Sequence, residues 1–153
     1  MGGMPQSFSD LNVHIVFSTK DRVAEIDGEI QGRVWEYIGG ILRGESCRLL
    51  AAGGMADHVH LLVSLSRDIS VADAVRVVKA NSSKWVHETF PERGGFAWQA
   101  GYAAFSVSRS NVEQVVQYIH GQAEHHDARD FKEELIAFLK RHGVAYDERY
   151  IWE

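Results

Sequence analysis

The chain has 153 residues, of which 45% are hydrophobic and 24% charged, the proportions of an ordinary soluble globular domain. No apolar run approaches the ~20 residues that cross a bilayer, and the first ten residues lack the basic and apolar regions of a signal peptide. The net charge of -5 argues against a protein that coats nucleic acid through a basic surface, although it leaves room for a local basic groove. The single cysteine, Cys47, excludes an intrachain disulfide and fits a reducing compartment, so we expect a cytoplasmic protein. Because no apolar run could span a bilayer, we expect no membrane contact.

Hydrophobic periodicity predicts the elements of the first half of the chain. Residues 11–19 alternate between two faces, which predicts a strand. A helix follows, because apolar side chains recur with the 3.6-residue period at Ile30, Val34, Ile38, Ile41 and Leu42. Two further strands, over 47–54 and 58–65, are joined by a short glycine-containing turn of the kind that closes a hairpin.

A second helix and a fourth strand come next. Ser70 and Asp73 have the spacing of a capping box, with Asp in place of the usual Glu, and mark the start of the helix. Its apolar side chains are Val71, Ala74, Val75, Val78, Trp85 and Val86. After a loop, the aromatic-rich residues 96–108 predict a strand.

Two more helices complete the chain. Ser110 and Glu113 form another capping-box pattern, which predicts a helix over 110–126. Its buried side carries Val112, Val115, Val116 and Ile119. A last helix, over 131–142, stops at Gly143. Its buried side chains are Leu135, Phe138 and Leu139.

The resulting order of elements is β-α-β-β-α-β-α-α. The first six follow the ferredoxin-like βαββαβ order, which predicts an α+β fold with an antiparallel sheet and helices on one face, extended by C-terminal helices. We expect a single domain over residues 1–153, because no linker, internal repeat or low-complexity stretch divides the chain.

His58 and His60 stand two residues apart at the start of an otherwise apolar strand, so their side chains point to the same face. Two imidazoles in this position can share one metal ion and leave room for another ligand. A strand that merely shows two polar side chains on its less buried face fits the same pattern, and the pair alone does not separate the two interpretations. Four of the eight histidines fall within 58–60 and 125–126, a clustering that favours a site.

Tyr118 and Gln122 are four residues apart, which places them one turn apart on the same face of the helix predicted over 110–126. A tyrosine at the flank of a buried stripe usually packs there with its hydroxyl in water. Beside a metal-binding amide, it is instead a candidate nucleophile. Because the ordinary pKa of the phenol is about 10, attack at neutral pH needs a metal ion, a base or a nearby cation.

Four segments carry a family resemblance: GMADHVHLLVSL, SSKWVHE, WQAGYAAFSVSRSNVEQVVQYIHGQAEHH and FKEELIAFLKRHGVAYDERYIW. Together they resemble the single-tyrosine transposases of bacterial insertion sequences, HUH-type enzymes that are named for a His-hydrophobic-His pair and move elements as single-stranded DNA. The resemblance runs from about residue 8 to the C-terminus and rests on the order and spacing of these segments. One departure is Ala56, where the family pattern has proline.

The resemblance implies a catalytic domain in which Tyr118 is the nucleophile. It matches His58 and His60 to the HUH pair, and Gln122 to the third ligand of Mg²⁺ or Mn²⁺. The implied substrate is single-stranded DNA with hairpin ends, which is cleaved through a 5′-phosphotyrosine link and rejoined by a 3′-hydroxyl. The resemblance also implies a homodimer in which the His pair of one subunit works with the tyrosine helix of the other.

Basic side chains suited to phosphate contacts occur on the second helix, after the first strand and before the tyrosine helix. They are Arg76, Lys79 and Lys84, Lys20 and Arg22, and Arg109. For each one, an ordinary solvated position is an equally good interpretation. Four aromatic residues could stack on bases, but core packing is favoured for most of them: Phe96, Trp98, Tyr102 and Phe105.

Other histidines and the cysteine leave alternatives open. His125 and His126 either add a ligand or proton carrier, if the tyrosine helix continues, or solvate the helix end. His14 lies beside the histidine pair only if the first and third strands are neighbours. Cys47 has no activating neighbour in the sequence, so we expect it to be buried and inert.

Three functions besides transposition fit the same residues. One is a host-adopted relative that cleaves repetitive hairpins without moving an element. Another is a non-catalytic nucleic-acid-binding module, although the chain lacks the aromatic signature of RNA-recognition domains. The last is a metal-dependent hydrolase in which water attacks in place of Tyr118.

Overall fold

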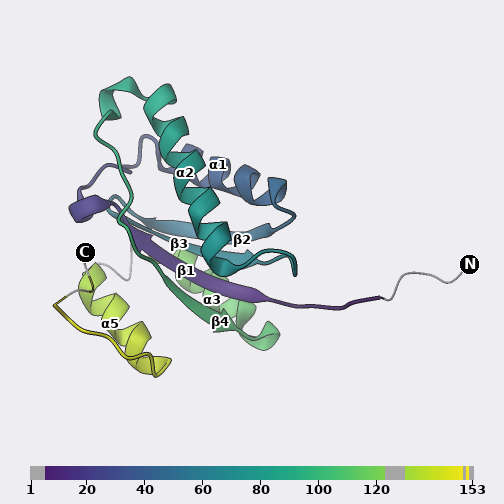
Figure 1. Cartoon of the computed structure of the whole chain (residues 1–153). Coiled ribbons are helices and arrows are strands. Elements are labelled where there is room, and N and C mark those ends of the chain that lie inside the picture. Colours follow the sequence, from purple (N-terminus) through teal and green to yellow (C-terminus); the bar gives the residue numbers. More distant parts are fainter. Residues whose placement is uncertain (1–5, 123–129, 150, 152–153) are drawn as a thin grey trace, which may run out of the picture.

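The computed structural model describes residues 6–122, 130–149 and 151. A four-stranded antiparallel sheet lies between two layers of helices (Figure 1). Its strands are β1 (Asn12–Ser18), β2 (Arg48–Met55), β3 (His58–Ser64) and β4 (Ala103–Val107). The spatial order is β2-β3-β1-β4, because β1 pairs with both β3 and β4. The predicted α+β, ferredoxin-like arrangement is therefore confirmed.

The helices divide between the two faces of the sheet. Two of them, α1 (Gln31–Gly44) and α2 (Val71–Thr89), cover one face, and α3 (Val112–His120) and α5 (Phe131–Arg141) lie on the other (Figure 1). Short 3-10 turns occur at Lys20–Arg22, Pro91–Arg93 and Arg109–Asn111. Within the described ranges, the structure has no helix with the length and apolar character needed to cross a membrane.

The main hydrophobic core lies between the sheet and the α1/α2 layer. Because successive side chains of a strand point to opposite faces, alternate residues of β1 and β3 enter this core. Ile15 and Phe17 of β1, with Val59 and Leu61 of β3, are at most 2% exposed. The helices supply Val34, Ile38, Leu42, Val75 and Val78.

The opposite face of the sheet is covered by two smaller apolar clusters. Ile119 of α3 packs against Ala51 and Leu62 of the sheet. Four side chains of α5 pack with Val16 and Phe105, and they are Phe131, Leu135, Phe138 and Leu139. Polar side chains on this second face of the central strands are therefore buried as well.

The fourth strand and the tyrosine helix differ from their predictions. β4 begins at Ala103, because the preceding residues form a loop. A bridge between Thr19 and Trp98 and the hydrogen bond from the Gln99 N–H to the Ser18 oxygen join this loop to the end of β1. α3 ends at His120, where a turn at Gly121 interrupts the helix predicted over 110–126. The last residues of that predicted helix lie outside the described part of the chain.

Of the two predicted helix caps, the structure has the one at Ser70 and lacks the one at Ser110. The hydroxyl of Ser70 accepts a hydrogen bond of 3.0 Å from the backbone N–H of Asp73, as predicted. Ser110 is hydrogen-bonded to Ser108 instead, and α3 begins after a 3-10 turn, so the second capping box was wrong. The predicted stop at Gly143 is confirmed by its φ of 65°, a left-handed conformation that favours glycine.

Gly53 lets the backbone of α3 approach the sheet closely. A Cβ atom on Gly53 would lie 2.3 Å from the carbonyl oxygen of Ile119 and 3.0 Å from its Cγ2. The first contact is with backbone, which cannot turn aside as a flexible side chain can. The last turn of α3 therefore rests directly on the main chain of β2.

We expect Gly53→Ala to push α3 away from the sheet and to lower the free energy of unfolding by about 1–3 kcal/mol, the usual cost of overpacking. Thermal or urea unfolding of the purified protein measures this loss. Gly28→Ala is the control, because a Cβ there meets nothing within 4 Å. Equal stability of the two variants would contradict the close approach.

Candidate active site

His58 and His60 project from β3 toward the face that α3 and α5 cover. Both are fully buried, at 0% exposure. The strand's alternation places them on the same side, next to Val16 of β1, which pairs with His60. The prediction of two imidazoles on one face is confirmed, and the interpretation that they lie on a less buried face is wrong.

Each of these imidazoles uses one ring nitrogen to reach an orienting partner. Nδ1 of His58 lies 2.7 Å from Oδ1 of Asp57, and Nδ1 of His60 lies 2.8 Å from Nε2 of His14. If each Nδ1 donates, the lone pair of each Nε2 is left for a metal ion. Partners of this kind fix the tautomer and the ring orientation of metal-binding histidines.

Because β1 and β3 are neighbouring strands, His14 of β1 lies beside His60, as we expected for that pairing. Its side chain is buried, at 2% exposure, and edge contacts with Phe138 of α5 and Phe105 of β4 surround it. Burial lowers the pKa of His14 to about 3, and the interaction with His60 adds to this effect. His14 is consequently neutral near pH 7 and can accept a hydrogen bond from His60.

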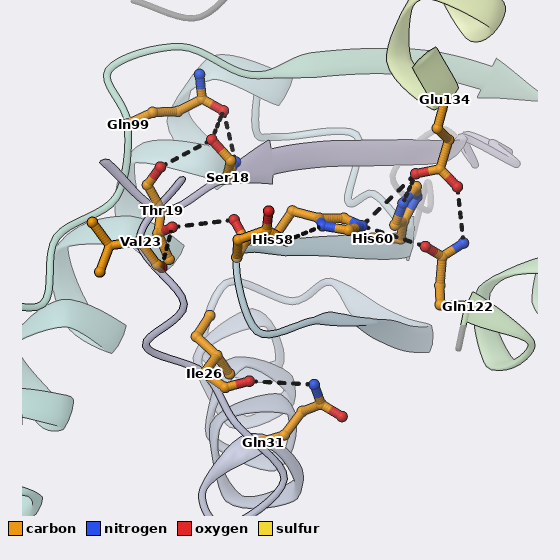
Figure 2. A network of polar contacts seen from close by, with 11 residues as sticks. Ser18, Thr19, Val23, Ile26, Gln31, His58, His60, Gln99, Gln122 and Glu134 are labelled. Atoms are coloured by element: carbon orange, nitrogen blue, oxygen red, sulfur yellow. Dashed lines mark hydrogen bonds and ion pairs between the residues drawn. The ribbon is translucent and has the colours of Figure 1, made fainter. Parts of the chain in front are cut away.

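Glu134 of α5 was missed by the sequence interpretation, and it is central to the cluster. Its Oε1 lies 2.9 Å from Nε2 of His60 and 3.7 Å from Nε2 of His58 (Figure 2). The sequence contained a signal: Glu134 follows Phe131 by three residues and precedes Phe138 by four, so it falls on the apolar stripe of its helix.

Tyr118 of α3 and Gln122, which follows α3, complete the cluster from the same face of the sheet as α5. The Tyr118 hydroxyl donates a hydrogen bond to Oε2 of Glu134. Oε1 of Gln122 lies 3.4 Å from Nε2 of His58, and its amide nitrogen lies 3.3 Å from Oε2 of Glu134 (Figure 2). The structure thus brings together His58, His60, Tyr118 and Gln122, the four residues singled out from the sequence.

The donor set suits a divalent metal ion. Ligand atoms of His58, His60 and Glu134 all lie within 4.8 Å of one another, and Gln122 adds an amide oxygen. Burial favours a higher pKa for the Glu134 carboxyl, but interactions with His60, Tyr118 and His58 hold that pKa at about 2. An ionised carboxylate and an amide supply oxygen donors and two imidazoles supply nitrogen donors, a mixed set that a divalent metal ion can accept.

Lys79, one of the six predicted DNA contacts, is held by the protein itself. Its Nζ donates hydrogen bonds to the backbone oxygens of Gln99, at 2.8 Å, and Gly101, at 2.6 Å. Burial lowers the pKa of Lys79 to about 8. This lysine ties α2 to the loop before β4, and a role in binding DNA would require it to leave these oxygens.

The other five predicted DNA contacts are exposed on the surface. Arg109 forms two hydrogen bonds with the carboxylate of Asp10, at 3.0 and 2.5 Å, and Arg76 is paired with Asp73 at 3.6 Å. The remaining three are Lys20, Arg22 and Lys84. Contact with DNA stays a prediction for all six.

Cys47 is buried, as predicted. Phe96 and Phe105 are core residues at 1% and 4% exposure, whereas Tyr102 is 43% exposed. His125 and His126 lie outside the described residues.

The chain belongs to the family of IS200-like transposases, because the model of that family matches residues 7–122. It is 26% identical over 117 residues to the ISDra2 transposase TnpA of Deinococcus radiodurans, a match that covers 73% of this chain and 84% of that protein. It is 29% identical over 116 residues to the IS200 transposase of Salmonella typhimurium, covering 72% and 76%. Membership makes the chain a DNA-processing enzyme of the transposase class.

Solved structures have the same fold. A crystal structure of a candidate transposase from Deinococcus radiodurans has a TM-score of 0.64 and 26% identity, covering 80% of this chain and 98% of that one. A REP-associated tyrosine transposase, solved bound to a REP hairpin, has a TM-score of 0.59 at 14% identity, covering 82% and 74%. At that identity the second likeness concerns the fold alone.

We expect His14→Leu to weaken the binding of Mn²⁺ by about ten- to a hundredfold, because His60 then loses the partner that orients its ring. Isothermal titration calorimetry on the metal-free protein measures the affinity. His120→Leu, on the exposed side of α3, is the matched control. An unchanged Mn²⁺ affinity in a folded His14→Leu protein would show that His14 does not orient a metal ligand.

Proposed function

We propose that the chain cleaves and rejoins single-stranded DNA at the ends of an insertion sequence, with Tyr118 as the nucleophile. The observation that supports this most directly is the hydrogen bond from the Tyr118 hydroxyl to Glu134, whose carboxylate also contacts His60. The phenol therefore lies among the candidate metal ligands rather than in water alone. In water, a phenol of pKa about 10 is a poor nucleophile at neutral pH. Family membership supports DNA as the substrate class.

His58, His60 and Gln122 are the residues proposed to hold Mg²⁺ or Mn²⁺. Bound there, the ion would polarise the scissile phosphate and offset negative charge that develops on it. The protein's own part is to keep both Nε2 atoms directed at the site, through Asp57 and His14, and to keep the cluster away from bulk water.

Tyr118 takes part in two transfers that need no ATP. In the first, a bond forms between its phenolic oxygen and phosphorus while the bond from phosphorus to the 3′-oxygen breaks. The phenol loses its proton and the 3′-oxygen takes one up, which leaves a 3′-hydroxyl and a 5′-phosphotyrosine. In the second, a 3′-hydroxyl of another strand attacks phosphorus and releases the tyrosine.

The proposed substrate is single-stranded DNA with hairpin ends. A solved protein of the same fold was bound to a REP hairpin, which supports hairpins as ligands. The exposed Lys20 and Lys84 are the first candidates for phosphate contacts. Three arginines are the next, since each already interacts with an acidic side chain: Arg22 with Asp57, Arg76 with Asp73 and Arg109 with Asp10. Cleavage of repetitive hairpins without transposition uses the same chemistry, and imperfect palindromes flanking the gene would favour transposition over it.

We also propose a homodimer with exchanged tyrosine helices, as the family resemblance implies. In the described chain, the Tyr118 and His60 rings of the same chain lie 5.9 Å apart between centroids. Exchange would replace this contact within one chain by the same contact between subunits.

Wild-type protein is expected to form a covalent adduct with labelled single-stranded DNA that carries its own flanking hairpin, in the presence of Mg²⁺. The adduct survives denaturing electrophoresis because it is a phosphotyrosine ester. Tyr118→Phe should form none, while Tyr37→Phe, a change of the same kind at an exposed tyrosine of α1, should form it normally. An adduct with Tyr118→Phe, or none with wild type, would refute the proposed nucleophile.

Mixing two inactive variants extends the same assay to the dimer. His58→Ala keeps its tyrosine and Tyr118→Phe keeps its histidines, so exchanged helices would restore about a quarter to a half of the adduct by random pairing of subunits. No recovery in the mixture would mean that each tyrosine works in its own chain.

Lys84→Gln and Lys20→Gln should each weaken hairpin binding, because each removes one phosphate contact. The slope of log K against log salt concentration should become less negative by about 0.7–0.9 in each variant. Fluorescence anisotropy over a salt series measures both quantities. Glu88→Gln, also exposed on α2, is the control and should keep the wild-type slope. An unchanged slope in both lysine variants would remove these residues from the interface.

A further inference from the structure

Glu134 joins the two halves of the site. We infer that its carboxylate bridges them: one oxygen is a ligand of the metal ion beside His58 and His60, while the other holds the Tyr118 hydroxyl in position. This inference rests on the proposed function, since it assigns a positioning role for the same nucleophile and the same metal ion.

The two carboxylate oxygens of Glu134 have different partners. Oε1 faces the histidines, at 2.9 Å from Nε2 of His60 and 3.7 Å from Nε2 of His58. Oε2 accepts a hydrogen bond from Tyr118 and lies 3.3 Å from the amide nitrogen of Gln122. An ionised carboxylate offers about four lone-pair positions, so it can serve a metal ion and a phenol together.

The surroundings of Glu134 make a purely structural role costly. The residue is 1% exposed and lies within the apolar stripe that α5 turns toward the sheet. A buried carboxylate is tolerated only when charged or hydrogen-bonding groups satisfy it. Here the groups that do so are the candidate metal ligands and the candidate nucleophile.

α5 is fixed in a way that suits a positioning element. The side chain of Asp130 caps its N-terminus by accepting a hydrogen bond from the backbone N–H of Glu133. Phe131 stacks on the ring of His58 at 4.3 Å, and Phe138 contacts Tyr118 edge-on at 5.5 Å. Glu134 stands between these two aromatic contacts, so the helix holds its carboxylate at the junction of the metal site and the tyrosine.

Two adjacent residues allow a matched test. Glu134→Gln removes the charge at nearly constant shape, and Glu133→Gln makes the same change at an exposed neighbour. We expect Glu134→Gln to weaken Mn²⁺ binding by at least about tenfold in calorimetry and to slow adduct formation at saturating Mn²⁺. Glu133→Gln should match wild type in both, and Tyr118→Phe, which keeps every proposed ligand atom, should still bind Mn²⁺ while forming no adduct.

The outcomes separate this inference from the proposed function. Wild-type Mn²⁺ affinity in a folded Glu134→Gln protein would overturn the ligand role, and wild-type adduct rate at saturating Mn²⁺ would overturn the positioning role. If wild-type protein forms no adduct at all, the nucleophile fails, whereas the ligand role is still decided by Mn²⁺ affinity. If Glu134→Gln does not fold, Glu134→Asp keeps the charge but shortens the reach, and wild-type affinity and adduct rate in that variant would overturn the bridge.

Discussion

The contact of the buried Glu134 carboxylate with His58 and His60 is the interaction on which the sheet face covered by α3 and α5 depends. Removing such a group from water costs on the order of several kcal/mol unless partners satisfy it. Glu134 is supported by His60, Tyr118 and Gln122, and the outer nitrogens of the histidines are supported by Asp57 and His14. Among the described residues, the buried side-chain atoms without a partner belong to Asn12 and Arg93, which are outside this cluster.

That electrostatic constraint explains why the C-terminal helices are built as they are. α5 must present one acidic side chain within an otherwise apolar surface, and α3 must bring a phenol to the same carboxylate. The α1/α2 layer carries no such demand, and its contacts with the sheet are those of a conventional hydrophobic core. Stability and chemistry are thus assigned to opposite faces of the same four strands.

The fold was predictable because its signals are local. Alternation in β1 and β3, and the 3.6-residue period of α1 and α2, specify each element and its buried side within a short window of sequence. The roles of His14 and Glu134 were harder to predict, because they depend on contacts between residues far apart in the sequence. His14 lies 46 positions from His60 and meets it through the pairing of β1 with β3, and Glu134 lies 74 positions from His60 and meets it through the packing of α5. Glu134 was overlooked because a glutamate on a helix normally faces solvent, although its place in the apolar stripe marked it.

The contact between Gly53 and the carbonyl oxygen of Ile119 has a consequence for how this protein tolerates change. The distance of α3, and hence of Tyr118, from the sheet is set by a contact between the backbones of α3 and β2. The side chains on the outer surface of α3 do not take part in this contact. Glu113, Gln114 and Gln117, all exposed on that helix, are therefore free to vary without moving the phenol. In contrast, one added methyl group at Gly53 of β2 would displace α3 and the Tyr118 phenol with it.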